Sequence, residues 1–201
     1  IFFIKGNKIM SNEKKTLPLL TLRDLIIFPG TIAPVFIGRE KSLNALLAAK
    51  KMDDGQHILL TTQKKHDIEE PTTSDLFKVG VLAKIIQTVK LPNNNAKILV
   101  EVINRVKLVN IEDKEIFVAD YLIIPDSEVN NLEALNHATD QVMEEFQEYA
   151  KNNKKINLEV LNILNQQKNP TYITNLIASH LDIKLDLKQS LLEQVDILKR
   201  A

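Results

Sequence analysis

The sequence predicts an α+β fold in which a β-rich, partly closed barrel is followed by a bundle of α-helices. Two observations carry this prediction. Up to about Pro125, apolar residues mostly alternate with a period of two, which is typical of strands. From Asp126 onward they recur every three or four residues, which is typical of amphipathic helices. Many short strands around a single early helix favour a small barrel over an open sheet.

The first half contains short apolar segments separated by turn residues. Phe28-Pro29-Gly30 breaks the chain between two strands, because proline fixes φ and glycine tolerates the positive φ of a tight turn. Asn93-Asn94-Asn95 suits a hairpin turn, since asparagine accepts left-handed geometry. We expect a mobile polar loop at Gln63–Ser74. The expected elements are strands at Leu17–Leu22, Ile32–Ile37, Ile58–Thr62, Lys78–Leu91, a return strand holding Ile98, Val100 and Val102, strands at Val106–Ile111 and Ile116–Ile124, and a helix at Arg39–Met52.

The second half is helical, and its start signals are polar side chains that can accept a hydrogen bond from the first turn. Asp126 or Ser127 can cap a helix that runs to about Ala150. Asn157 can cap a short helix, and Asn169 followed by Pro170 is a further start signal. Asp186 can cap a last helix running through Leu198. The apolar stripe expected for the first of these helices contains Val129, Leu132, Leu135, Val142, Met143, Phe146 and Tyr149.

These patterns predict three parts in the chain. Residues 1–15 form a disordered or vector-derived extension, since Met10 followed by a polar run resembles a natural start. Residues 16–125 form the β-rich part. Residues 126–201 form the helical part, whose last helix has no glycine, asparagine or proline to stop it, so we expect a truncated long helix.

Composition excludes several classes of function. The formal net charge is zero, with 26 Lys+Arg against 26 Asp+Glu. The chain therefore has no overall positive charge that would attract nucleic acid or anionic lipid. The absence of cysteine excludes disulfides, thiolate metal sites and a cysteine nucleophile, and it allows a reducing compartment. No apolar run approaches the roughly 20 residues that a membrane span needs.

The sequence contains no recognisable catalytic, cofactor or metal site. The five glycines never take the spacing of a phosphate-binding loop, which needs backbone N–H groups free of an obstructing Cβ. The four histidines are scattered and do not form a metal-binding pair. Adjacent acids such as Glu144-Glu145 point in different directions on a helix. We therefore predict no catalytic residue, no cofactor site and no metal site in this chain.

Binding of polypeptide is the function class that the residues favour. A surface that takes unfolded chains needs accessible apolar side chains with little specificity. The candidate substrate-binding residues lie near the Pro-Gly turn: Phe28, Pro29, Pro34 and Phe36. The alternative is that these four side chains fill the barrel core or its junction with the helices. Arg23, Asp24, Arg39 and Glu40 are expected to form local salt bridges or caps.

Several stretches of the chain resemble one known family. The segment LPLLTLRDLIIFPGTIAPVFIGR (17–39), with its strand, Pro-Gly turn, strand and helix entry, is followed by GREKSLNALLAAKKMDDGQHILLTTQKK (38–65) and DLFKVGVLAKIIQTVKLPNNNAKILVEVINRVKL (75–108). Together with EEFQEYAKNNKKI (144–156) and ASHLDIKLDLKQSLLE (178–193), these stretches resemble the amino-terminal, substrate-binding domain of the Lon ATP-dependent proteases. Thr21 and Asn157 stand where the family pattern has proline, both at local turn or cap positions.

The resemblance carries expectations beyond the residues themselves. It implies a PUA-like pseudo-barrel followed by helices, in a cytoplasmic parent protein that assembles as a homo-hexamer and needs ATP and Mg²⁺. The parent would be a serine endopeptidase that degrades misfolded and regulatory proteins, with its catalytic parts outside this chain. The implied partners are unfolded or misfolded polypeptides and other copies of the parent, with no nucleic acid and no membrane. The alternatives are a stand-alone Lon-domain adaptor, an RNA-binding PUA-like protein, which the neutral charge disfavours, and a hydrolase, which no residue supports.

Overall fold

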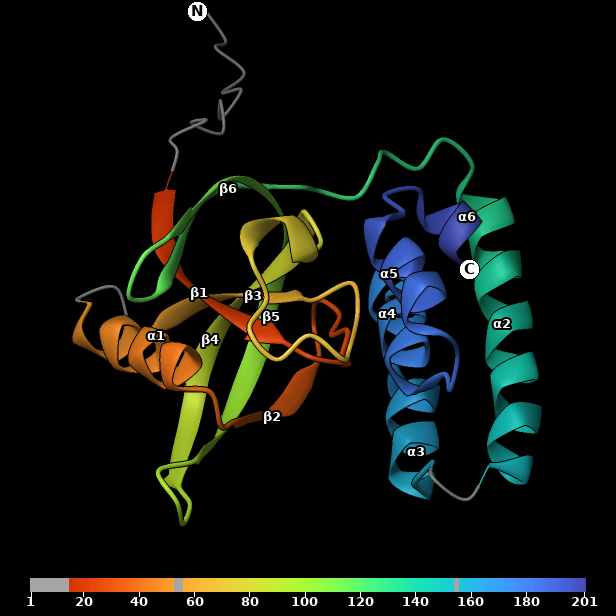
Figure 1. The fold of residues 1–201 in the computed structure, drawn as a ribbon. Helices are drawn as coiled ribbons and strands as arrows, with labels where there is room; N and C mark the ends of the chain where they lie inside the picture. The colour runs from red at the N-terminus through yellow and green to blue at the C-terminus, as the bar shows by residue number, and fades with distance from the viewer. Residues whose placement is uncertain (1–14, 53–55, 154–155) are drawn as a thin grey trace, which may run out of the picture.

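The computed structural model describes residues 15–52, 56–153 and 156–201, and the expected extension at residues 1–15 lies outside them apart from Lys15. Within these residues, six strands and one early α-helix are followed by five α-helices (Figure 1). The β-rich part contains β1 (Lys15–Leu22), β2 (Ile32–Ile37), α1 (Glu40–Lys51), β3 (His57–Thr62), the short 3₁₀ helix η1 (Thr73–Asp75), β4 (Val79–Lys90), β5 (Ala96–Asp113) and β6 (Phe117–Ile123). The helices that follow are α2 (Leu132–Asn152), α3 (Leu158–Gln166), α4 (Pro170–His180), α5 (Leu185–Glu193) and α6 (Ile197–Arg200).

The strands form one sheet in the order β2-β5-β4-β3-β1-β6, and a further pairing between β5 and β6 closes it into a barrel. β1 lies parallel to β3 and antiparallel to β6. Alternate side chains point to two sides of the wall, so two apolar clusters form. The larger contains Leu20, Phe28, Val35, Ile85 and Ile98, and the smaller contains Leu17, Leu59, Val106, Phe117 and Tyr121. The predicted barrel is therefore present.

Strand β5 differs from its prediction. The sequence predicted two strands in this region, but one strand of 18 residues extends from Ala96 to Asp113. Its first part pairs with β2 and its last part with β6, while β4 pairs with most of its length. Register shifts leave Ile86, Ile103 and Val109 without a direct partner. β-bulges accommodate the extra residues, so one strand continues through the polar residues Asn104 and Arg105.

The turn predictions are confirmed by the backbone. Gly30 has φ +83°, and a Cβ added there would lie 3.0 Å from the Tyr172 ring. Asn93 and Asn94 both have φ +58°, and the Leu91 N–H donates to the Asn95 carbonyl across the hairpin. Left-handed geometry is costly for most residues and least so for glycine and asparagine.

Two helix caps are confirmed, and the predicted start of the first helix after the barrel is wrong. The Oδ1 atoms of Asn157 and Asn169 accept hydrogen bonds from the N–H groups of Glu159 and Tyr172. Helix α2 begins at Leu132 with Asn131 as its cap, because Asp126 binds arginines instead. Val129 and Leu132 are consequently exposed, whereas Leu135 and Phe146 of the same predicted stripe are buried.

The single last helix of the prediction is two helices in the structure. Helix α5 ends at Glu193, and α6 starts at Ile197 after a break. The Asp196 carboxylate caps α6 by accepting from the N–H groups of Leu198 and Lys199. An internal N-cap of this kind competes with helix continuation, since its backbone is extended. The predicted N-cap role of Asp186 is also wrong, because Lys184 occupies that position.

The helices contact the barrel mainly through α4 and α5. Ala178 and Leu192 belong to the larger barrel core. Asn175 Nδ2 donates to the Pro29 carbonyl at 3.0 Å, and Gln189 Nε2 donates to the Val79 carbonyl at 3.0 Å. Figure 1 shows the chain crossing from β6 to α2 along one end of this contact. The division into residues 16–125 and 126–201 stays a prediction. None of the described helices is long and apolar enough to cross a membrane.

Candidate functional site

The four candidate residues separate into two buried and two exposed positions. Phe28 is 0% exposed and lies in the main core, so it cannot offer accessible surface. Pro29 is half-buried and its carbonyl binds Asn175 of α4, which places it at the junction with the helices. Pro34 is exposed and Phe36 is 69% exposed. Phe28 and Pro29 therefore fit the alternative role, whereas Pro34 and Phe36 remain available for contact.

Pro34 and Phe36 belong to an exposed apolar surface on the outer side of β2, β5 and β4. Residues opposite one another in the ladder lie on the same side of the sheet. Phe36 faces Lys97, which faces Val89, and Pro34 faces Leu99, which faces Gln87. We call this surface the outer apolar strip: Ile32, Pro34, Phe36, Ile86, Val89, Leu99 and Ile103.

Sequence reasoning missed five members of this strip. Ile32 could have been found, because the alternation in Ile32–Ile37 assigns it to the same side as Phe36. Ile86 and Ile103 could not, since both stand at register shifts that sequence alone does not reveal. Five of the strip's side chains are 39–69% exposed: Ile32, Phe36, Ile86, Val89 and Ile103.

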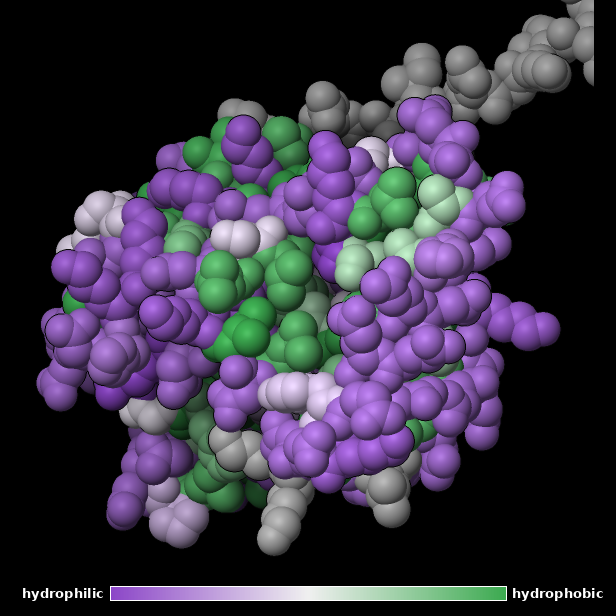
Figure 2. Space-filling model, turned by 90° about the vertical axis from the view of Figure 1, so that its right-hand side faces the viewer, coloured by the Kyte–Doolittle hydropathy of each residue, from purple (hydrophilic) through white to green (hydrophobic). Residues whose placement is uncertain are grey.

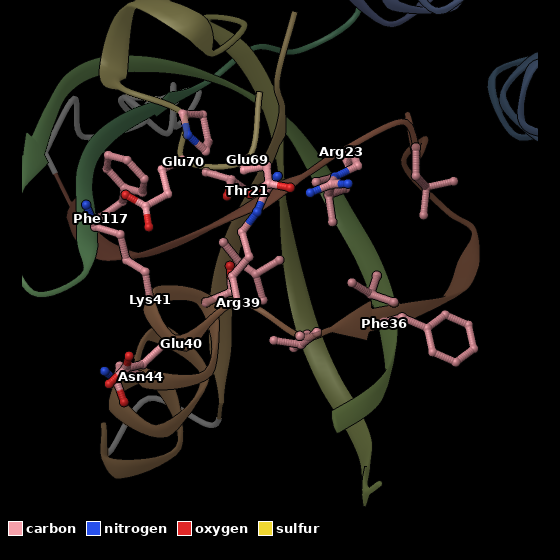
Figure 3. Close-up of a pocket in the computed structure, with 18 of the residues that line it drawn as sticks. Thr21, Arg23, Phe36, Arg39, Glu40, Lys41, Asn44, Glu69, Glu70 and Phe117 are labelled. Atoms are coloured by element: carbon pink, nitrogen blue, oxygen red, sulfur yellow. Dashed lines mark hydrogen bonds between the residues drawn. The ribbon is translucent and has the colours of Figure 1, made fainter. Parts of the chain in front are cut away.

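A cleft of about 1100 Å³ adjoins the strip and separates β1 from β2 (Figure 3). Its walls are the end of β1 with the segment that follows it and the end of β2 with the start of α1. Figure 3 shows Arg39 extending toward Thr21 and Glu69, whereas the Phe36 ring points away from the cleft. Phe36 thus stands at the rim, between the cleft and the outer apolar strip.

Arg39 forms the floor of this cleft. Its Nη2 donates to Gln63 Oε1 at 2.7 Å and to the Ile68 carbonyl at 3.2 Å. Gln63 is 0% exposed, and its Nε2 also donates to the Ile68 carbonyl at 2.9 Å. Burial lowers the pKa of Arg39, with a further contribution from Arg23, and Glu69 acts in the opposite direction. Arg39 occupies the N-cap position of α1, as expected, but its side chain makes no capping hydrogen bond and holds the loop after β3 instead.

A second apolar surface lies on the side of the molecule formed by the helices. Figure 2 shows hydrophobic residues gathered in a hollow at the centre of this side, flanked by hydrophilic ones. In the core between the helices, several side chains of α2 and α3 are only partly buried: Val142, Met143, Tyr149, Val160 and Leu161.

The described residues form no group of three or more His, Cys, Asp and Glu side chains that could hold a metal ion. Ser179 Oγ lies 2.9 Å from His180 Nδ1, and both atoms also bond to the Leu176 carbonyl. These bonds satisfy carbonyl groups at the end of α4, so they do not activate a nucleophile. The candidate sites among the described residues are therefore the cleft and the exposed apolar strip beside it.

Comparisons with known proteins agree with this assignment. Residues 16–201 match the family described as the ATP-dependent protease La (LON) substrate-binding domain. The Lon protease of Rickettsia prowazekii is 46% identical over 194 residues, which cover 94% of this chain and 25% of that protein. The Lon protease of Haemophilus influenzae is 38% identical over 189 residues, covering 94% of this chain and 23% of that protein.

Two solved structures share the fold. The N-terminal domain of Mycobacterium avium complex Lon protease has a TM-score of 0.72 at 18% identity, covering 92% of this chain and 94% of that one. A Lon N-terminal domain protein from Xanthomonas campestris has a TM-score of 0.63 at 14% identity, covering 92% and 94%. The chain spans about a quarter of the length of the curated relatives, and it belongs to the Lon substrate-binding domain family.

Proposed function

We propose that this chain captures unfolded or misfolded polypeptides for a Lon-type ATP-dependent serine protease and has no catalytic site of its own. The outer apolar strip carries this proposal. Large apolar side chains at 39–69% exposure are grouped on neighbouring strands, whereas isolated exposed hydrophobic residues need no explanation. Surfaces of this kind are typical of sites that bind apolar segments with little sequence specificity.

The parent protein is part of the same proposal. By analogy with the Lon proteases that it resembles, it would assemble as a homo-hexamer, act in the cytoplasm, and use ATP and Mg²⁺ at sites outside these residues. Several copies of a weak binding surface in one ring would hold a substrate more tightly than one copy, because the second contact becomes intramolecular. The individual surface can therefore be weak and still serve substrate capture.

The Phe36→Ser variant tests the strip directly. We expect it to weaken binding of a permanently unfolded polypeptide, such as reduced and carboxymethylated α-lactalbumin, by about tenfold, because an exposed aromatic anchor is worth at least about 1.4 kcal/mol. Fluorescence anisotropy of the labelled polypeptide gives the Kd. Stability should change little, since Phe36 is 69% exposed.

Leu132→Ser is the matched control. Leu132 is 64% exposed and lies at the start of α2, away from β2. We expect its Kd to equal that of the unmodified chain. Equal weakening in both variants would indicate nonspecific apolar attraction, and unchanged binding in Phe36→Ser would refute the role of the strip.

A further inference from the structure

The cleft beside the outer apolar strip lies at an incompletely paired seam of the barrel. β1 pairs with β6 through Leu19 and with β3 from Leu19 onward, so between Leu20 and Leu22 one edge of β1 has no strand partner among the described strands. β2 is the terminal strand of the sheet order, and β5 is its one partner in the same set. Both of these edges line the cleft. Unpaired edges of this kind can accept an added extended segment.

Negative side chains outnumber positive ones along the cleft. Five carboxylates and three cations line it, and one of the cations, Lys41, is engaged with Asp113 and with the Phe117 ring. Arg39 is held by Gln63 and Ile68. No ion pair in the described part of the chain engages four of the acids: Glu40, Glu69, Glu70 and Glu115. An occupant that carries a positive charge is therefore electrostatically complementary.

We propose that this cleft takes a short, extended polypeptide segment carrying a lysine or arginine side chain, which pairs with the free edge of β2 and faces Glu69 and Glu70. This inference rests on the proposed function and names the substrate class within it. The apolar residues of the segment would extend over Phe36 at the rim, onto the outer apolar strip.

Pro34 limits how long such a segment can be. It lacks an N–H group, and proline within a sheet occupies edge strands with its missing donor on the unpaired side. An added strand consequently receives no hydrogen bond from Pro34, and it can pair with β2 only before and after this residue. This arrangement favours brief, reversible contacts with many sequences over a single stable ladder.

Three nine-residue peptides of alternating valine and serine test the charge preference, with lysine, glutamine or glutamate at the centre. At low salt we expect the lysine peptide to bind the full chain about fivefold more tightly than the glutamate peptide, as screened surface charges allow. In the double variant Glu69→Gln, Glu70→Gln this ratio should fall towards one, with the glutamine peptide unchanged. The double variant Glu144→Gln, Glu145→Gln removes equal charge from the exposed side of α2 and should keep the ratio.

N-methylation of alternate residues in the lysine peptide tests strand pairing. Because alternate N–H groups of a strand face opposite edges, methylation of one set should abolish binding and methylation of the other set should leave it intact. Equal binding of the three unmethylated peptides would overturn this inference while leaving the proposed function standing. If none of the three unmethylated peptides binds and unfolded α-lactalbumin does not bind either, the proposed function itself is refuted.

Discussion

Replacing Gly80 with alanine should lower the free energy of unfolding by about 3 kcal/mol or more, which is the upper range for overpacking a core. A Cβ at this position would lie 2.3 Å from the Leu60 carbonyl oxygen and 3.2 Å from Thr61 Cβ. The first of these atoms is backbone in the neighbouring strand β3, so no side-chain rotation relieves the clash. Strands β3 and β4 would have to separate at the point where the barrel wall is fully buried.

Urea denaturation followed by circular dichroism measures this effect, and Gly38→Ala is its control. A Cβ at Gly38 would meet Asn95 Oδ1 at 3.1 Å, which is the end of a side chain that can move. We expect Gly38→Ala to change stability by less than about 1 kcal/mol. Similar losses in the two variants would mean that general conformational restriction, and not the Leu60 contact, causes the effect.

Replacing Asp126 with asparagine should lower the free energy of unfolding by about 3 kcal/mol, because it leaves two buried guanidinium groups without a counter-charge. Asp126 Oδ1 accepts from Arg105 Nη1 at 2.8 Å and from Arg200 Nη1 at 3.0 Å. The side chains of these arginines are 3% and 0% exposed. One carboxylate thus connects the barrel strand β5 to the last helix α6.

The control for this variant is Asp140→Asn on the exposed side of α2, with an expected change within about 0.5 kcal/mol. Hydrogen exchange adds a local measurement, since α6 should lose protection in Asp126→Asn before the strands do. Full protection of α6 in that variant would show that the apolar contacts of Ile197 hold this helix without the ion pairs.

Lowering the pH should remove the stabilisation that Asp126 gives to the unmodified chain. Burial favours the neutral form of Asp126, but hydrogen bonds and attraction from Arg200 and Arg105 outweigh it and lower the pKa of this carboxyl group. A depressed pKa in the folded state gives stability that is fully present above the ordinary value of about 3.9 and is lost as pH falls through the folded value. We therefore expect the difference between the unmodified chain and Asp126→Asn, measured in urea, to shrink below about pH 4. A constant difference down to pH 2 would contradict this assignment.

Local signals predicted local structure well in this protein. Asn157 and Asn169 cap their helices because the hydrogen bond that each makes spans two or three residues. The same holds for Gly30 and for Asn93-Asn94, whose positive φ angles follow from steric tolerance. The apolar alternation that predicted a barrel also reflects a local rule, because successive side chains in a strand point to opposite faces.

Contacts between distant residues account for the errors. Asp126 was expected to cap a helix, but it binds Arg105 and Arg200, which lie 21 and 74 positions away. The burial of Phe28 depends on the main core, to which α4 and α5 contribute. Two of the four candidate residues, Pro34 and Phe36, are nevertheless exposed and belong to the outer apolar strip. The cleft depends on a gap between β1 and β2 that no periodicity reveals.

The pairing of β1 with β6 has a consequence for the order in which a nascent chain can fold. Leu17 faces Ala119 and Thr16 faces Asp120, so the start of the first strand waits for about a hundred residues of synthesis before its partner β6 exists, although the end of the strand can pair earlier with β3. During translation, at roughly 5–20 residues per second, this leaves the start of the strand without its β6 partner for several seconds. Pairings of such long sequence separation also form slowly. A chaperone that shields the nascent segment around β1 would consequently benefit this protein more than one that acts after release from the ribosome.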